Sequence, residues 1–150
     1  MSVTPINLEE RRAGSHKLIQ ELVDVRTEML SLYSELATKH PFNENTGVDE
    51  LLEQFCQSLI DYTADAHFRL YRFIDERKER RRSVLDVADQ VYPGIVSTTQ
   101  SILEFNDKYD FQEHDRELAS LADDLSVLGE RLADRIDLED EVIRVLQVAK

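Results

Sequence analysis

Histidines and carboxylates are the side chains of this chain that could carry acid–base or metal chemistry. The sequence holds four histidines and 31 acidic residues. Helical bundles that bind two metal ions use a Glu-x-x-His pair on each of two helices. None of the four histidines has an acid three positions before it, because the residues found there are Ala13, Ala37, Ala64 and Phe111. We therefore expect no metal site and no cofactor.

Three side chains could still form an acid–base group if the fold brought them together, namely Asp61, His67 and Glu139. The alternative is a polar cluster in which Arg26, Tyr62 or His67 satisfies Glu139. We favour the cluster, because Glu139 lies within an apolar stripe where a bare carboxylate would cost several kcal/mol. GxGxxG, Walker, HExxH and GxSxG motifs do not occur, so we expect no enzymatic activity.

Long amphipathic segments must position these side chains. The sequence predicts a first helix over about residues 8–39 and a second over about 48–82, where the basic run 77–82 forms its solvated end. One apolar stripe predicts the last helix, and it consists of Leu118, Leu121, Leu125, Leu128, Leu132, Ile136, Ile143 and Leu146.

The third segment contains a proline. Ser83 is a candidate N-cap for this helix, and Pro93 predicts either a kink or a break followed by a fresh helix. We expect a helical segment on each side of Pro93 and a short connection over 106–111. The fold class is therefore all-α, an up-and-down antiparallel four-helix bundle with a Pro-interrupted third helix, in a single domain of residues 1–150.

Charge and composition restrict the partners. A net charge of −13 repels phosphate backbones, so we expect no nucleic-acid binding. The same charge would attract a basic partner, although the acids could instead serve only solubility. The single Cys56 is expected to be a packed thiol in a reducing compartment. No apolar run has the length of a membrane span, and we expect a cytoplasmic protein.

The segment from Phe55 to Ile74 is the densest apolar and aromatic run. Its core stripe is Leu52, Phe55, Leu59, Tyr62, Ala66, Leu70 and Phe73. On the far side, Phe68 falls among Asp61, Asp65 and Arg72. Aromatic anchors ringed by charge are typical of interface hot spots. Burial of a second face in the bundle would explain Phe68 equally well.

The same segment resembles a known family. Phe55-Cys56-Gln57, then Leu59 to Tyr62, and His67-Phe68 with Tyr71 are similar to the central motif of the regulator of sigma D (Rsd)/AlgQ family. Three further matches follow in the right order, and they are Gly14 with Lys17 to Ile19 and Arg26, Tyr92-Pro93, and Leu138 to Asp140. The family commonly has an Arg-Trp pair where this chain has Glu21-Leu22.

This resemblance implies an anti-sigma factor that binds the C-terminal promoter-recognition region of the housekeeping sigma factor. Such binding sequesters the sigma factor from RNA polymerase core and favours alternative sigma factors in stationary phase. We expect a monomer that forms a one-to-one complex. An alternative is a regulator of a metabolic or stringent-response enzyme through the same bundle surface, and a third is a metal or small-ligand bundle built on His67 and Glu139.

Helix phase together with the resemblance predicts two groups of site residues. The expected partner-binding residues are Asp61, Asp65, Phe68 and Arg72. The expected polar cluster at or beside them consists of Arg26, Tyr62, His67, Tyr71, Glu139 and Asp140.

Overall fold

Four long helices make up most of the computed structural model, which describes residues 8–42, 47–72, 82–109 and 118–148. Their bounds are α1 Leu8–Ala37, α2 Val48–Ala66, α4 Arg82–Lys108 and α5 Leu121–Val148. A π-helical turn, η2 His67–Arg72, continues α2, and a 3₁₀ turn, η3 Leu118–Ser120, precedes α5. No strand occurs in these described ranges. The predicted all-α four-helix bundle is confirmed.

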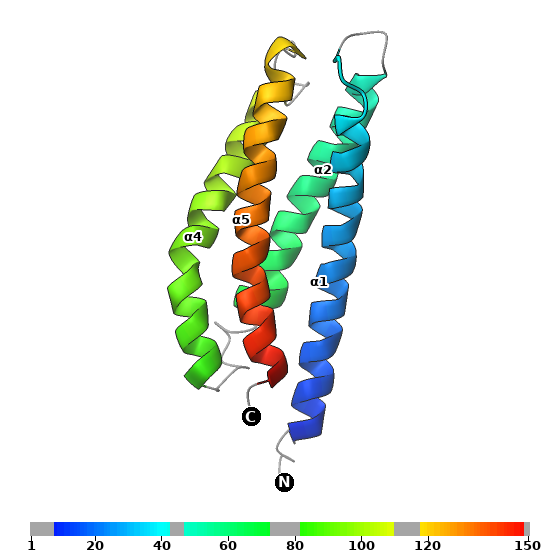
Figure 1. Ribbon diagram of the computed structural model, residues 1–150. Helices are drawn as coiled ribbons and strands as arrows, with labels where there is room; N and C mark the ends of the chain where they lie inside the picture. Colours follow the sequence, from blue (N-terminus) through cyan, green and yellow to red (C-terminus); the bar gives the residue numbers. More distant parts are fainter. Residues whose placement is uncertain (1–7, 43–46, 73–81, 110–117, 149–150) are drawn as a thin grey trace.

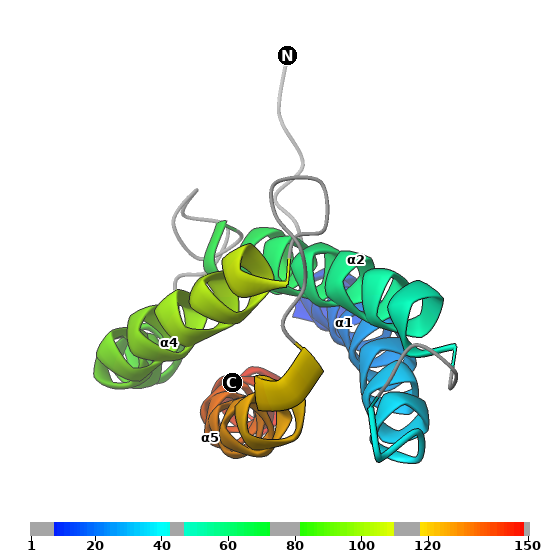
Figure 2. The same cartoon turned by 90° about the horizontal axis from the view of Figure 1, so that it is seen from above.

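The helices run up and down in sequence order (Figure 1). The α1–α2 hairpin and the α4–α5 hairpin pack against each other, with α1 contacting α5 and α2 contacting α4. Viewed from above, the four helices surround a common interior (Figure 2). Within the described part of the chain, no helix is both long enough and apolar enough to cross a membrane.

The α2 stripe forms the centre of the core. Its buried residues are Val48, Leu51, Leu52, Phe55, Leu59, Tyr62 and Ala66, and Leu70 of η2 is also buried. Phe73 lies outside the described residues. At one end of the bundle, the Phe55 ring packs edge-on against Tyr33 of α1 and Phe105 of α4, with ring centroids 5.8 and 6.1 Å apart. These aromatic contacts join the two hairpins.

Helix α4 continues through Pro93, so of the two outcomes predicted there, a kink or a break, the break does not occur. Pro93 cannot donate a hydrogen bond to the carbonyl of Asp89, but both residues are exposed and water can replace that donor. Val91 and Ile95 are buried on either side and hold the helix against the core. Tertiary packing therefore outweighs the local preference of proline.

Several predicted boundaries also differ. Arg82 is the first residue of α4 rather than the end of the second helix, and the rest of the basic run lies outside the described residues. Ser83 is therefore inside α4 rather than at its N-cap. The connection expected from residue 106 begins later, because α4 continues to Lys108, whose Nζ pairs with Asp124 Oδ2 at 2.7 Å.

The stripe of α5 departs from the predicted one at its centre. Leu121, Leu125, Leu128 and Leu132 are buried as expected, but Ile136 is only partly buried. Arg135 takes the interior position instead and is 1% exposed. A buried guanidinium requires hydrogen-bond acceptors, and Glu139 and Thr99 provide them.

Candidate functional site

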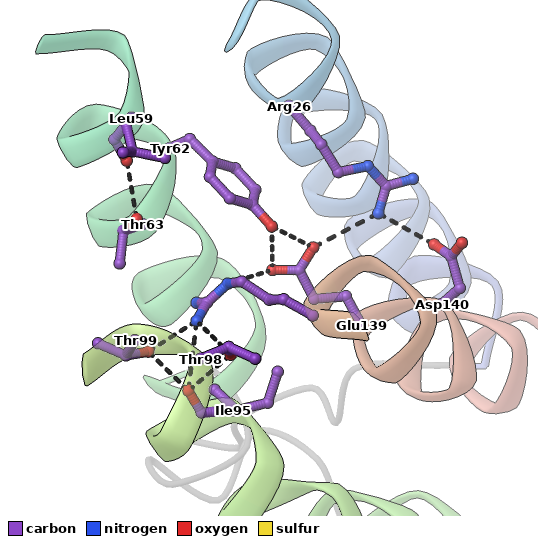
Figure 3. Close-up of polar contacts among 10 residues, drawn as sticks. Arg26, Leu59, Tyr62, Thr63, Ile95, Thr98, Thr99, Glu139 and Asp140 are labelled. Carbon is purple, nitrogen blue, oxygen red and sulfur yellow. Dashed lines mark hydrogen bonds and ion pairs between the residues drawn. The ribbon is translucent and has the colours of Figure 1, made fainter. Parts of the chain in front are cut away.

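A fully buried carboxylate lies at the middle of the bundle. Glu139 of α5 is 0% exposed, and the hydroxyl of Tyr62 on α2 donates toward both of its oxygens at 2.7 Å (Figure 3). A charge removed from water requires such partners, because an unpaired one would cost several kcal/mol. This contact ties α2 to α5.

Arg135 supplies the main opposite charge. Its Nε donates to Glu139 Oε2 at 3.1 Å, one helical turn away. Its Nη1 donates to Thr99 Oγ1 at 2.6 Å and lies 3.4 Å from the Ile95 carbonyl oxygen. Its guanidinium carbon is 5.7 Å from the centre of the Tyr62 ring, within range of a cation–π contact. Arg135 therefore links α5 to α4.

Arg26 of α1 extends the cluster toward the surface. Its Nη1 lies 3.4 Å from Glu139 Oε1 and 3.0 Å from Asp140 Oδ1 (Figure 3). The side chain of Arg26 is 14% exposed and that of Asp140 is 48% exposed. Two arginines thus balance two carboxylates, and all four helices contribute to one network.

Burial and the neighbouring charges raise the pKa values of both Glu139 and Tyr62. Burial raises the pKa of the Glu139 carboxyl above 4.5, and the nearby Arg135, the Tyr62 hydroxyl and Arg26 offset this only partly. Burial, followed by the negative charge of Glu139, raises the pKa of the Tyr62 phenol far above its usual range. Tyr62 therefore remains a hydrogen-bond donor, and the arrangement favours structure rather than proton transfer.

The structure does not bring the predicted acid–base group together. Asp61 is exposed and accepts a hydrogen bond from Gln57 at 3.0 Å. His67 is exposed and packs edge-on against Phe68, with ring centroids 5.9 Å apart. The polar-cluster alternative is therefore the correct one for Glu139, with Arg26 and Tyr62 as partners.

The membership of that cluster needs two changes. Arg135 was missed, although its position four residues before Glu139 is the spacing of a helical ion pair and could have indicated it. His67 is at the surface instead, and the side chain of Tyr71 lies outside the described residues. No group of three or more metal-ligating side chains lies close enough together to hold an ion in the part of the chain that the structure describes.

The second candidate region is the end of α2 with η2. Phe68 is 53% exposed, so it is not a core residue. The single Nε–H of Arg69 donates toward both carboxylate oxygens of Asp65 at 2.8 Å, and Arg69 also pairs with Glu21 of α1. Leu22, beside Glu21, is 0% exposed and fills the core. The side chain of Arg72 is outside the described residues.

The third region is an open groove of about 890 Å³ between α1 and α2. Four acids line it, namely Asp24, Glu28, Glu53 and Asp61, and none of the described residues that line it is basic. Val25 and Leu32 are half-buried and form an apolar floor. Apart from Asp61, the acids of the groove were not singled out from the sequence, because the groove exists only when two distant segments pair.

Comparison with known proteins gives a consistent result. The model of one family, described as "Regulator of RNA polymerase sigma(70) subunit, Rsd/AlgQ", matches residues 2–147. A protein named "Regulator of sigma D" from Yersinia enterocolitica is 32% identical over 142 residues, which cover 92% of this chain and 85% of the relative.

Two further relatives with the same name have similar identity and coverage. The protein from Enterobacter sp. (strain 638) is 34% identical, covering 91% of this chain and 84% of the relative. The protein from Salmonella paratyphi A is 34% identical, covering 93% of this chain and 88% of the relative. No solved structure matches the chain in this kind of comparison.

Proposed function

Because this chain belongs to the Rsd/AlgQ family of regulators of the RNA polymerase sigma(70) subunit, we propose that it acts as an anti-sigma factor. It binds the C-terminal promoter-recognition region of the housekeeping sigma factor and sequesters that factor from RNA polymerase core, favouring alternative sigma factors in stationary phase. It does so as a single cytoplasmic domain, in a one-to-one complex, by binding alone and without a cofactor.

The charge of the chain supports this proposal. A protein region that reads promoter DNA carries basic side chains, since phosphate contacts provide much of its affinity. A partner with a net charge of −13 presents a competing negative surface to that region. Binding of this kind is faster at low salt, because opposite charges steer the two proteins together.

The observation that carries the proposal is the exposed aromatic ring of Phe68. It lies in η2, directly after the end of α2, and more than half of its surface is open to a partner. Asp65 is already held by Arg69, so we assign it the role of positioning Arg69 beside the contact surface. Asp61 and Arg72 complete the proposed surface.

The buried cluster has a supporting role in this proposal. Arg26 and Tyr62 connect α1 and α2 to Glu139. These contacts fix the position of α2, which bears Asp61 and Asp65 and continues into η2. Asp140 is the member that reaches solvent. The cluster therefore preorganises the surface and reduces the conformational cost of binding.

The test is calorimetric titration of the protein with the purified C-terminal region of the sigma factor. We expect Phe68→Ala to weaken binding by about 1 to 3 kcal/mol, as truncation of a hot spot does, with unchanged helicity by circular dichroism. Val127→Ala is the matched control, because Val127 is 55% exposed on α5, and its affinity should equal that of the unaltered protein.

Two results would contradict the proposal. The absence of binding by the unaltered protein would remove the proposed partner, and equal affinity of the Phe68→Ala variant would remove Phe68 from the contact surface. Affinity purification from a stationary-phase lysate should also recover the sigma factor. Recovery of a metabolic or stringent-response enzyme instead would support a regulator of that enzyme.

A further inference from the structure

The groove between α1 and α2 has the shape and charge of a docking site for a helix. Its α1 wall extends from Asp24 to Leu32 and its α2 wall from Glu53 to Asp61. Each wall is about 12 Å long at 1.5 Å per residue, which matches about two turns of a bound helix. The volume of about 890 Å³ is open along this length, so a helix can lie in it from outside.

Among the described residues, no ion pair neutralises the negative charge of the walls. Asp24 and Asp61 accept hydrogen bonds only from the neutral amides of Gln20 and Gln57, at 3.1 and 3.0 Å, among the described residues. Glu28 and Glu53 are exposed on the two opposite walls. Because α1 and α2 are antiparallel (Figure 1), Asp24 and Asp61 share the end of the groove far from the connecting loop.

The floor of the groove is apolar, whereas its walls carry the acidic side chains. Val25 and Leu32 pack against the core from below while part of each side chain remains exposed. Acidic walls above an apolar floor fit an amphipathic helix whose apolar edge is flanked by Lys or Arg. A second copy of this chain fits badly, since its net charge of −13 would place acid against acid. DNA and RNA are excluded on the same ground.

We propose that the groove between α1 and α2 binds a basic amphipathic helix of the partner, with Asp24, Glu28, Glu53 and Asp61 as its charge partners. This inference rests on the proposed function, in which the helix belongs to the DNA-reading region of the sigma factor. It moves the main charged contact away from Asp65, which Arg69 neutralises, and along α2 to Asp61. Phe68 then contacts the partner beyond the open end of the groove.

A charge-matched pair of variants tests this assignment. The groove variant carries Asp24→Asn, Glu28→Gln, Glu53→Gln and Asp61→Asn. The control variant makes the same changes of residue type at exposed positions on the other hairpin, and carries Asp89→Asn, Glu130→Gln, Asp137→Asn and Glu141→Gln. Both variants lose the same amount of negative charge, so a difference between them reports position rather than net charge.

Binding is measured by fluorescence anisotropy of the labelled C-terminal region of the sigma factor, at two salt concentrations. The groove variant should bind about 10- to 100-fold more weakly at low salt, since four exposed ion pairs are lost. Its affinity should also depend less on salt than that of the unaltered protein. The control variant should bind within about threefold of the unaltered protein, because distant charges are screened.

A second pair of variants adds charge instead of removing it. Gln57→Lys places a cation within the groove, whereas Gln100→Lys places one on the exposed surface of α4. The first should weaken binding several-fold more than the second. Equal binding by groove and control variants in both pairs would overturn the inference and leave the proposed function standing. A lack of binding by the unaltered protein would overturn both.

Discussion

The cluster around Glu139 and the groove between α1 and α2 use the same kinds of charged side chain in opposite surroundings. Inside the bundle, Glu139 is matched by Arg135 and Arg26, and Arg26 also pairs with the half-exposed Asp140. In the groove, four carboxylates face water with no basic residue among the described lining. Burial makes pairing obligatory, whereas solvent allows charge to remain unmatched. Interior charges therefore specify the structure, and surface charges stay available to a partner.

The largest effect should come from removing the cation of the buried cluster. Arg135→Met leaves Glu139 without its closest cation, so we expect a loss of about 3 to 5 kcal/mol in the free energy of unfolding. Chemical denaturation at pH 7 measures it. Arg131→Met is the control, because Arg131 is half-exposed and its Nη1 is 3.7 Å from Asp134 Oδ2. Equal losses of stability in the two variants would show that burial does not raise the cost of removing an arginine.

A smaller loss should follow removal of the buried hydroxyl. Tyr62→Phe deletes a donor to an ionised acceptor, and we expect a loss of about 1.5 to 3 kcal/mol in the free energy of unfolding. Tyr33→Phe deletes a hydroxyl that donates to the neutral Leu125 carbonyl at 2.6 Å, which should cost about 0.5 to 1.5 kcal/mol. The reverse order in denaturation experiments would argue against an ionised Glu139.

The pH dependence of stability tests whether burial, which raises the pKa of Glu139, outweighs the nearby arginines, which lower it. Because the pKa of Glu139 is raised above 4.5 in the folded protein, the folded state binds this proton more tightly than the unfolded state. Its contribution to stability is fully present below pH 4.5 and is lost as the pH rises through the raised value. Glu139→Gln cannot titrate and lacks this dependence.

The stability advantage of the unaltered protein over Glu139→Gln should therefore widen as the pH falls toward 4.5. Denaturation curves of both proteins over this range provide the measurement, and the other carboxylates cancel in the difference. A narrowing advantage would mean that the arginines dominate and lower the pKa of Glu139 instead.

The smallest effect is expected in the groove. Glu53→Gln removes an exposed carboxylate, and the free energy of unfolding should change by no more than about 0.5 kcal/mol. Thermal denaturation at low salt checks this, and a slight gain in stability is the expected direction because nearby acids repel one another. A large loss would show that the groove carboxylates are structural, which would remove the contrast with Glu139.

Periodicity alone predicted the helices and most of the core correctly. The predicted stripe is buried from Leu52 to Leu70 as expected, and the position of Glu139 within an apolar stripe correctly indicated a satisfied buried carboxylate. These features depend on residues close in sequence, where one helical period decides which side chains share a face.

The errors have a different physical origin. Arg135 and Ile136 follow Leu132 at i+3 and i+4, so both fit the stripe and hydrophobicity selected the wrong one. The structure buries Arg135 because Glu139 and Thr99 satisfy its guanidinium. The groove and the continuous α4 likewise depend on contacts between distant segments, which the spacing of one segment does not contain.

Along the bundle axis, the polar side chains around Glu139 lie between two apolar blocks of one core cluster. The block nearer the α1–α2 loop includes Leu52, Phe55, Phe105, Tyr109, Leu121 and Leu125, and the other includes Leu22, Leu70, Val84, Ala88, Val91 and Leu146. Substitutions that share no partners and lie more than about 7 to 10 Å apart are usually additive. Substitutions in different blocks are therefore expected to be nearly additive, provided that the side chains around Glu139 keep the helices in register. The two ends of the bundle can therefore be altered with little effect on each other, although they belong to one fold.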